Sequence, residues 1–337
     1  MYEMNIEFHY YSLYFLCRNA GFQEREAEII SISSQLVDEC VAPWKISSES
    51  RFPFTEVTQN YSFWDENIST NIYIPFHFIP GSAKNAAELR LDKKKGKNVV
   101  TPDSPFARDI LITALKSGNL FRIGIALHAY ADTWAHQNFS AHNDEVNAFP
   151  GTALLPAVGH LHALKKPDIP PLVWTDQRLK AECRTIDNAA RFKRAAGMIY
   201  RFLCTSKQRE FKDESLVIGA LEEIWQRQSE TSDSSARISD YIVDLNVPPY
   251  GQEAWVRACG GIPSEDAGQS ASSLLMSNGY DKAIWIKAAV RQTEMFSGRA
   301  RGIIPMGTYE GSLFESWNEA VRAHRAYVLA HPGLSRN

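Results

Sequence analysis

The stretch LFRIGIALHAYADTWAHQNFSAHN, residues 120 to 143, predicts the central helix of the fold. Its mostly apolar pattern carries three polar side chains at steps of four residues: His128, Asp132 and His136. Residues four apart lie one above the other on an α-helix, so all three side chains project from one face. The isoleucines, leucines and alanines around them belong in a core. A buried stripe of two imidazoles and one carboxylate is unfavourable unless something compensates, and a divalent metal ion does so most directly.

A buried polar network that is satisfied without any ion is the alternative interpretation of this stripe. For a single histidine on an apolar face it is the better interpretation. The HxxxDxxxH spacing, however, suits ligation of a metal ion from one helix face. We therefore favour a metal site.

The composition is that of a globular protein, with 44% hydrophobic and 22% charged residues in a chain of 337. The net charge of −3 gives no electrostatic reason for nucleic-acid binding. The one basic cluster, at residues 93–97, is short and predicts a solvated loop. Five scattered cysteines without a CxxC pair predict reduced thiols. The N-terminus lacks the basic region of a secretory signal and no apolar run is long enough to span a membrane, so we expect a cytoplasmic protein.

Helical patterns recur along the chain and strand signals are scarce, which predicts an all-α fold: a large helical bundle with long irregular connections. We expect helices over residues 8–21, 24–37, 107–115, 120–143, 181–204, 209–228, 233–243 and 313–330. The segment NIYIPFHFIPG, residues 71–81, contains two prolines and is predicted as an extended, buried connector. A metal-binding core over residues 1–178 and a helical C-terminal part over residues 179–337 are expected to pack as one continuous domain. The loop at residues 228–237 is the only boundary candidate, and a weak one.

Histidines and acids that can bind metal gather before residue 169, whereas residues 169–323 contain no histidine. In chain order the candidate ligands are His9, Asp38, His77, His128, Asp132, His136, His160 and Asp168. Asp38 lies at the C-terminal end of its predicted helix, where the helix dipole disfavours a carboxylate, so a cation is one candidate partner. Mixed imidazole and carboxylate ligands in this number exceed what one four-coordinate ion needs and suggest two or three metal ions.

Not every histidine is expected at this site. His160 and His162 lie about 200° apart if their segment is helical, so we expect only one of them to face it. His324 and His331 have no acidic partner at ligand spacing and are predicted to lie on the surface.

The order of these residues resembles that of the zinc-dependent phospholipase C and single-strand nuclease superfamily, whose members are mostly helical and hold a cluster of metal ions. Those proteins have an early histidine, a bridging-type acid, a histidine in an aromatic segment, an HxxxD helix, a further histidine and a last pair of ligands. The positions that match here, in that order, are His9, Asp38, His77, His128 with Asp132, His136 or His142, and His160 with Asp168. The match covers roughly the first 175 residues. The chain is also similar to an uncharacterised bacterial family with an ALHxYADTWAHQ core.

The chain departs from the superfamily pattern in three places. The secreted enzymes use the amino group of an N-terminal tryptophan as a ligand, whereas this chain begins Met-Tyr. The next histidine usually follows the aspartate by six residues, whereas His136 follows it by four and His142 by ten. An acid usually stands four residues after the last histidine, where this chain has Leu164. These departures favour two metal ions over three.

The resemblance implies a hydrolase of phosphoester bonds, phosphodiesters before monoesters, whose substrate is a small phosphoester, a lipid or a nucleotide. A metal-activated water would be the nucleophile, and Asp38 or Asp132 would bridge the metals or orient that water as a general base. Zinc is the first choice of metal, with manganese or iron as alternatives. Trp64, Phe76 and Trp134 either line an apolar wall for the substrate or, as we prefer, pack in the core.

Two other functions compete with this one. An HD-type phosphohydrolase also uses buried histidines and aspartates, but it needs an adjacent His-Asp pair, which this sequence lacks. A helical scaffold or binding protein would keep the cluster as a structural metal site or a polar network, for a protein partner that the sequence does not identify. No GxSxG motif, Walker loop or GxGxxG motif is present, so serine-hydrolase chemistry and nucleotide cofactors are not indicated.

Overall fold

The computed structural model describes residues 5–47, 54–60, 65–152, 156–227, 234–251, 255–256, 262–263 and 300–334. Across these residues the chain is mostly helical, as predicted. The longer helices are α1 (Leu13–Asn19), α2 (Glu24–Glu39), α5 (Ala83–Leu89), α6 (Pro105–Ser117), α7 (Leu120–Ala135), α8 (Asn188–Ser206), α9 (Glu214–Gln226), α10 (Ser235–Asp244) and α15 (Leu313–Ala330).

Several shorter helical segments connect them. The single turns are α3 (Glu66–Ile68), α4 (Ile74–Phe76), α14 (Met306–Tyr309) and the 3₁₀ segments η3 (Glu145–Asn147), η4 (Leu161–Ala163) and η5 (Lys166–Asp168). Two further segments are π-helices, η1 (Glu7–Ser12) and η2 (Ser69–Tyr73). Both of them precede or contain a predicted ligand, since His9 lies in η1 and His77 follows η2 closely.

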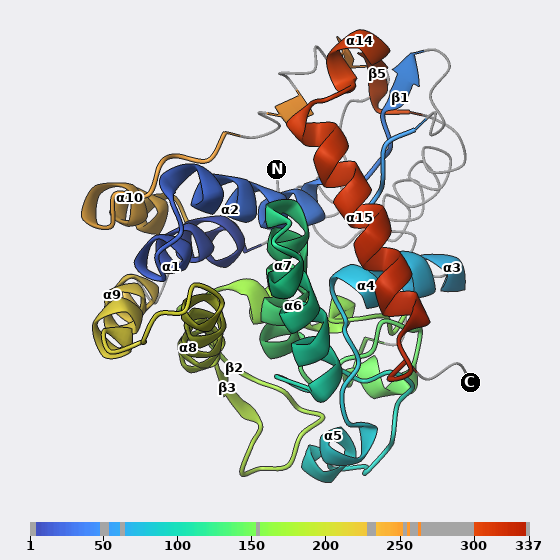
Figure 1. The fold of residues 1–337 in the computed structure, drawn as a ribbon. Helices are drawn as coiled ribbons and strands as arrows, with labels where there is room; N and C mark the ends of the chain where they lie inside the picture. Colours follow the sequence, from blue (N-terminus) through green and yellow to red (C-terminus); the bar gives the residue numbers. More distant parts are fainter. Residues whose placement is uncertain are drawn as a thin grey trace.

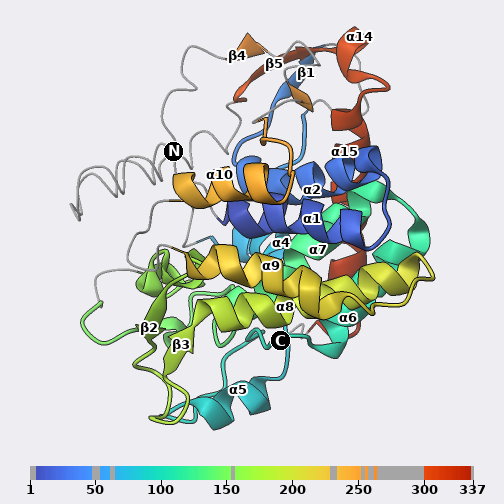
Figure 2. The same cartoon turned by 90° about the vertical axis from the view of Figure 1, so that its left-hand side faces the viewer.

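Helix α7 lies at the centre of the molecule (Figure 1), and α2, α6, α8 and α15 pack around it. In the side view, α1, α2, α8, α9 and α10 run next to one another (Figure 2), so helices from both halves of the chain share one face of the molecule. The apolar core therefore forms around the predicted central helix.

Two small sheets complete the described fold. The strand β5 (Gly302–Pro305) pairs in parallel with β1 (Lys45–Ser47) and antiparallel with β4 (Ile262–Pro263), with Lys45 opposite Ile303. The hairpin of β2 (Val173–Thr175) and β3 (Thr185–Asp187) places Val173 opposite Asp187. This hairpin occupies the start of the helix predicted at residues 181–204, which is why α8 begins only at Asn188.

The sequence sets the ends of α7 locally. The side chain of Asn119 accepts a hydrogen bond from the Arg122 N–H and caps the first turn. The helix ends at Ala135, earlier than the predicted residue 143, but the N–H of His136 still donates to the Asp132 carbonyl at 2.8 Å. His136 therefore stays on the same face as Asp132.

The segment around Pro75 corrects the prediction of an extended connector. It is buried as predicted, but α3, η2 and α4 follow one another without a break from Glu66 to Phe76. A proline inside a helix leaves the carbonyl four residues earlier without its N–H partner. Here that carbonyl, on Asn71, accepts a hydrogen bond from the Arg325 side chain at 3.0 Å. A residue 254 positions away thus makes a helical turn possible where the local sequence argues against one.

The smaller predictions concern the surface and the thiols. The lysines of residues 93–97 are exposed, as expected for a solvated loop. Cys17, Cys40, Cys183 and Cys204 are free thiols, and Cys259 lies outside the described residues. Within the described part of the chain, no helix has the length and apolar character needed to cross a membrane.

The closest approach of α2 and α7 depends on Gly124. A Cβ at this position would overlap the backbone carbonyl oxygen of Ile30 and lie 2.6 Å from the Ser33 Cβ. We expect Gly124→Ala to lower the free energy of unfolding by about 1–3 kcal/mol, because backbone atoms of α2 must move. Gly219 in α9 is the matched control: a Cβ there would meet nothing within 4 Å, so Gly219→Ala should raise stability by about 0.5–1 kcal/mol. Urea denaturation of both variants measures the difference, and equal effects would contradict this account of the α2–α7 contact.

Candidate metal centre

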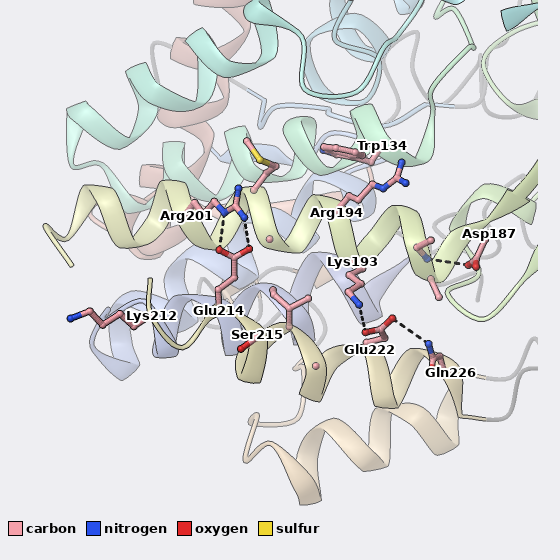
Figure 3. Close-up of a pocket in the computed structure, with 16 residues that line it drawn as sticks. Trp134, Asp187, Lys193, Arg194, Arg201, Lys212, Glu214, Ser215, Glu222 and Gln226 are labelled. Atoms are coloured by element: carbon pink, nitrogen blue, oxygen red, sulfur yellow. Dashed lines mark hydrogen bonds and ion pairs between the residues drawn. The ribbon is translucent and has the colours of Figure 1, made fainter. Parts of the chain in front are cut away.

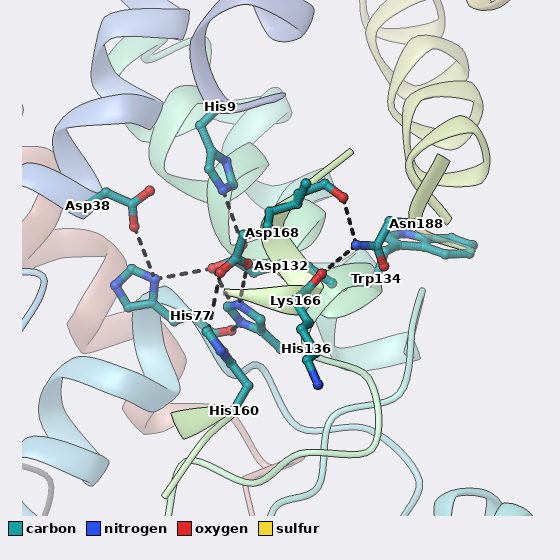
Figure 4. A network of polar contacts seen from close by, with 12 residues as sticks. His9, Asp38, His77, Asp132, Trp134, His136, His160, Lys166, Asp168 and Asn188 are labelled. Atoms are coloured by element: carbon teal, nitrogen blue, oxygen red, sulfur yellow. Dashed lines mark hydrogen bonds and ion pairs between the residues drawn. The ribbon is translucent and has the colours of Figure 1, made fainter. Parts of the chain in front are cut away.

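The stripe on α7 faces a buried space in which the predicted ligands from other elements meet. His128, Asp132 and His136 are 0%, 4% and 6% exposed. Side chains from α2, η1, the end of α4 and the segment around η5 converge on Asp132 (Figure 4). All eight predicted ligands fall into sets of three whose ligand atoms lie close enough to hold a metal ion.

Four of these residues form what we call the deep group: Asp38, His77, His128 and Asp132. The Nδ1 atom of His77 lies 3.2 Å from Asp132 Oδ2 and 3.8 Å from Asp38 Oδ1. The Nε2 atom of His128 lies 3.4 Å from Asp132 Oδ2 and 3.6 Å from Asp38 Oδ1. The two imidazole nitrogens are 3.2 Å apart. Ligand atoms around a tetrahedral zinc ion lie about 3.3 Å apart, since each bond is about 2.0–2.1 Å long. The deep group has the separations that one ion requires.

The remaining three residues, His136, His160 and Asp168, form the shallow group. The Nε2 atoms of His136 and His160 lie 3.7 Å and 3.9 Å from the two carboxylate oxygens of Asp168. The two imidazole rings stack with centroids 4.6 Å apart, and Phe78 stacks on His136 at the same spacing. The side chains of His160 and Asp168 are 19% and 14% exposed, whereas Asp132 is 5% exposed. Solvent therefore reaches the shallow group more readily.

Backbone carbonyls fix which imidazole nitrogens face the acids. His77 donates from Nε2 to the Thr58 carbonyl at 2.9 Å, which leaves the lone pair of Nδ1 directed at the deep group. His136 donates from Nδ1 to the His77 carbonyl at 2.8 Å, and His160 from Nδ1 to the Leu164 carbonyl at 2.8 Å. A metal-binding histidine typically donates its other N–H in this way, because the bond fixes the tautomer and the ring. Three of the predicted ligands are thus held ready to bind.

Burial and charge push the pKa values of the cluster apart. Burial, with the nearby carboxylates of Asp132 and Asp168, raises the pKa of Asp38 well above its usual range. Burial also acts on Asp132, but His136 and His128 outweigh it and hold the pKa of Asp132 well below its usual range. Burial and the neighbouring His9 lower the pKa of His128 to about 3. For His136 burial is outweighed by the carboxylates of Asp132 and Asp168, which raise its pKa to about 9.

One buried carboxylate oxygen of the cluster has no hydrogen-bond partner among the described residues, the Oδ2 atom of Asp38. An unpaired buried carboxylate oxygen is unfavourable unless a cation or a proton compensates. Together with the lone pairs that His77 and His160 direct toward carboxylates, this atom fits the binding of divalent ions. The buried histidine and aspartate groups can therefore hold metal.

Four other histidines lie outside the centre. His142 lies 2.7 Å from Glu66 and accepts from Asn98, so His136 and not His142 is the next histidine of the cluster. His162 accepts from the Phe149 N–H at 3.1 Å, so only His160 of the pair faces the site. The prediction that His324 and His331 lie on the surface is wrong. His324 is 1% exposed and bonds to the Pro75 carbonyl at 2.9 Å, and His331 is partly buried and lies 3.0 Å from Asp109.

The aromatic candidates do not line the cluster together. Phe76 is fully buried and stacks on His324, as core packing predicts. Trp134 lines a separate cavity of about 940 Å³ between α8 and α9, which none of the eight predicted ligands lines (Figure 3). Trp64 lies outside the described residues. Ion pairs such as Lys193–Glu222, at 2.6 Å, bridge α8 and α9 beside this cavity.

Residues of the C-terminal half hold the segments that carry the ligands. The side-chain amide of Asn188 donates to the carbonyls of Lys166 and Ile169, at 2.6 Å and 2.8 Å, on either side of Asp168 (Figure 4). Arg325 donates to the Val57 carbonyl at 2.8 Å, next to the residue whose carbonyl orients His77. Sequence reasoning missed both, because their partners lie 19 to 268 positions away and no spacing rule connects them.

The chain belongs to a protein family of unknown function, DUF6765, whose model matches residues 4–331. No curated protein and no solved structure matches it. Family membership thus assigns no activity, and the function has to follow from the chemistry of the centre.

Metal binding should release protons from this centre. At pH 7 the raised pKa values of Asp38 and His136 keep both groups protonated without metal, whereas a metal ligand must be deprotonated. We expect about two protons released per fully loaded chain, and zinc affinity that rises from pH 6 toward pH 9 as His136 loses its proton. Calorimetry in buffers of different ionisation enthalpy measures the release, and Asp38→Asn should release one proton fewer. Affinity that is independent of pH would contradict the assignment.

Removing the amide of Asn188 should weaken the shallow group alone. Asn188→Ala frees the carbonyls on either side of Asp168, and loss of such outer support typically lowers metal affinity by about 10–100-fold. A zinc titration should show this loss for one ion and unchanged binding of the other. Asn98→Ala, which disturbs His142 outside the centre, is the matched control. Equal weakening of both ions would point to a general loss of structure instead.

Proposed function

We propose that this protein is a metal-dependent hydrolase of phosphoester bonds, phosphodiesters in particular, that holds two divalent ions in the deep and shallow groups. One observation carries the proposal: a buried four-residue group adjoins a partly open three-residue group, with Asp132 Oδ2 3.6 Å from His136 Nδ1. Zinc is the first candidate because imidazole and carboxylate ligands at tetrahedral separations suit it, and manganese and iron are the alternatives.

The two groups would have different tasks. Four protein ligands fill the coordination shell of a tetrahedral ion in the deep group, whereas three in the shallow group leave one position for water or a substrate oxygen. The metal ions would supply an acidified water and positive charge for the phosphoryl oxygens. Asp132 lies between the groups, and Asp38 borders the deep one with a free oxygen, so either carboxylate can orient the water or accept its proton.

A relation to the zinc-dependent phospholipase C and single-strand nuclease superfamily is part of this proposal. It is supported by the meeting of the residues in their expected order at one place: the HxxxD pair on α7, His77 from the aromatic segment, and the pair of His160 and Asp168. Leu164, where the superfamily has an acid, is exposed, and Asp168 stands in that role. The substrate class follows from this relation: a nucleotide, a lipid or another phosphodiester.

A helical binding or scaffold protein is the second candidate. The saturation of the deep group favours it, because structural zinc sites typically have four protein ligands and no open position. The shallow group separates the two candidates, since a purely structural role gives no reason for a partly exposed second set of ligands.

The full chain, purified without chelator or polyhistidine tag, should contain about two divalent ions and hydrolyse bis(4-nitrophenyl) phosphate faster than 4-nitrophenyl phosphate. Elemental analysis and absorbance at about 400 nm measure both quantities. A chelator should abolish hydrolysis, and zinc or manganese should restore it. His160→Ala should lose the shallow ion and the activity but keep the deep ion. The double variant His128→Ala, Asp132→Ala should lose both ions.

His331→Gln is the control, because this histidine lies outside the centre and should retain both ions and the activity. Less than about half an ion per chain after reconstitution would contradict a metal site altogether. Two bound ions without hydrolysis of any phosphodiester or phosphomonoester would favour the scaffold.

A further inference from the structure

His9 differs from the other predicted ligands in what surrounds it. Its Nε2 atom lies 3.2 Å from Asp132 Oδ1, whereas His77, His128 and His136 all face the other oxygen, Oδ2. In Figure 4, His9 reaches Asp132 from above, and His136 and His160 lie below. His9 therefore meets the carboxylate on a side that neither group uses.

A third ion at His9 would lack ligands. The only other candidate ligand grouped with His9 and Asp132 is His128, whose ring stacks on that of His9 at 3.8 Å. The Nε2 atom of His128, however, already faces the deep group. Among the residues that the structure describes, such an ion would have two protein ligands of its own, fewer than the three or four of zinc sites.

We propose that His9 is a positioning residue for Asp132 and not a metal ligand, an inference that rests on the proposed metal function. A neutral imidazole carries one N–H, and here Nε2 donates it to Asp132 Oδ1. The bond fixes the plane of the carboxylate so that Oδ2 faces the deep group and His136. Outer partners of this kind orient ligands and tune the metal that they bind.

A buried ion pair sets the position of His9. Glu7, two residues earlier in the π-helix η1, receives two hydrogen bonds from Arg237 of α10, at 2.8 Å and 2.9 Å. Both side chains are almost completely buried, so removing either charge leaves the other unpaired inside the protein. π-Helical turns are rare and frequently lie at functional sites, where the extra residue changes the direction of a side chain.

A second contact from the same helix holds the end of η1. Ser12 donates to the Glu7 carbonyl at 2.7 Å and lies 3.2 Å from the hydroxyl of Tyr241, one turn after Arg237 on α10. Trp225 of α9 donates to that hydroxyl at 2.7 Å. The π-helix is thus held at both ends by residues of the C-terminal half, and these residues fix how far His9 reaches.

The test counts ions in the wild-type chain and in His9→Gln, whose amide can still donate a hydrogen bond. We expect two ions in both proteins, and a changed visible absorption spectrum of the cobalt-substituted variant, because the carboxylate of Asp132 turns. We also expect kcat to fall by less than about 10-fold in His9→Gln and by about 10–100-fold in His9→Leu, which cannot donate. Arg237→Lys should change the cobalt spectrum in the same direction with both ions retained.

The outcomes separate this inference from the proposed function. A wild-type chain without bound ions overturns the proposed function, whatever His9 does. Three ions in the wild type, or one ion lost in His9→Gln, overturn the positioning role and make His9 a ligand. An unchanged cobalt spectrum in His9→Gln overturns it as well. Arg201→Lys is the control, because its bidentate pair with Glu214 joins α8 and α9 away from the centre and should change neither ion count nor spectrum.

Discussion

The burial of the Asp132 carboxylate is the constraint on which the rest of the centre depends. A charged carboxylate that is removed from water needs a partner for each oxygen, and few packed helices can supply that many donors from nearby sequence. Here the partners come from three places: His9 in η1, His77 after α4, and the flanking histidines of α7 itself. Satisfying one side chain thus requires that segments far apart in sequence meet at one helix face. The fold around α7 is the solution to that requirement.

The C-terminal half contributes no predicted ligand, yet the centre depends on it. Arg237 holds the turn that carries His9, Arg325 holds the segments on either side of His77, and Asn188 holds the loop that carries Asp168. Each is a buried or partly buried polar side chain that bonds to backbone carbonyls or to a buried acid. Breaking such a buried pair typically costs about 3–5 kcal/mol, far more than a surface contact. The absence of histidine from residues 169–323 therefore reflects a division between binding and positioning, and not a lack of involvement in the site.

Local periodicity predicted only part of this arrangement. The stripe on α7 could be read from spacing alone, because helical geometry determines which residues share a face. The meeting of His77 and His160 with that stripe is not a local property, and only the order of residues along the chain indicated it. The prediction failed at Pro75 and at His324 for the same physical reason. The Arg325 side chain bonds the carbonyl that the proline leaves free, and His324 of the same helix bonds the Pro75 carbonyl, so long-range hydrogen bonds override the local preferences.

The local structure around the two ligand groups explains why they should behave differently. Asp38, His128 and Asp132 lie on the long helices α2 and α7, which pack closely, so the deep group can move little. His160 and Asp168 lie in a stretch of single 3₁₀ turns, where Leu164 adopts a left-handed backbone with φ of 55°. Loops of this kind carry function because a rigid scaffold positions them while solvent still reaches them. A catalytic ion has to exchange water and substrate, which a fully packed helical site prevents. If one of the two groups performs chemistry, it is therefore the shallow group, and the deep group serves as the fixed charge against which it works.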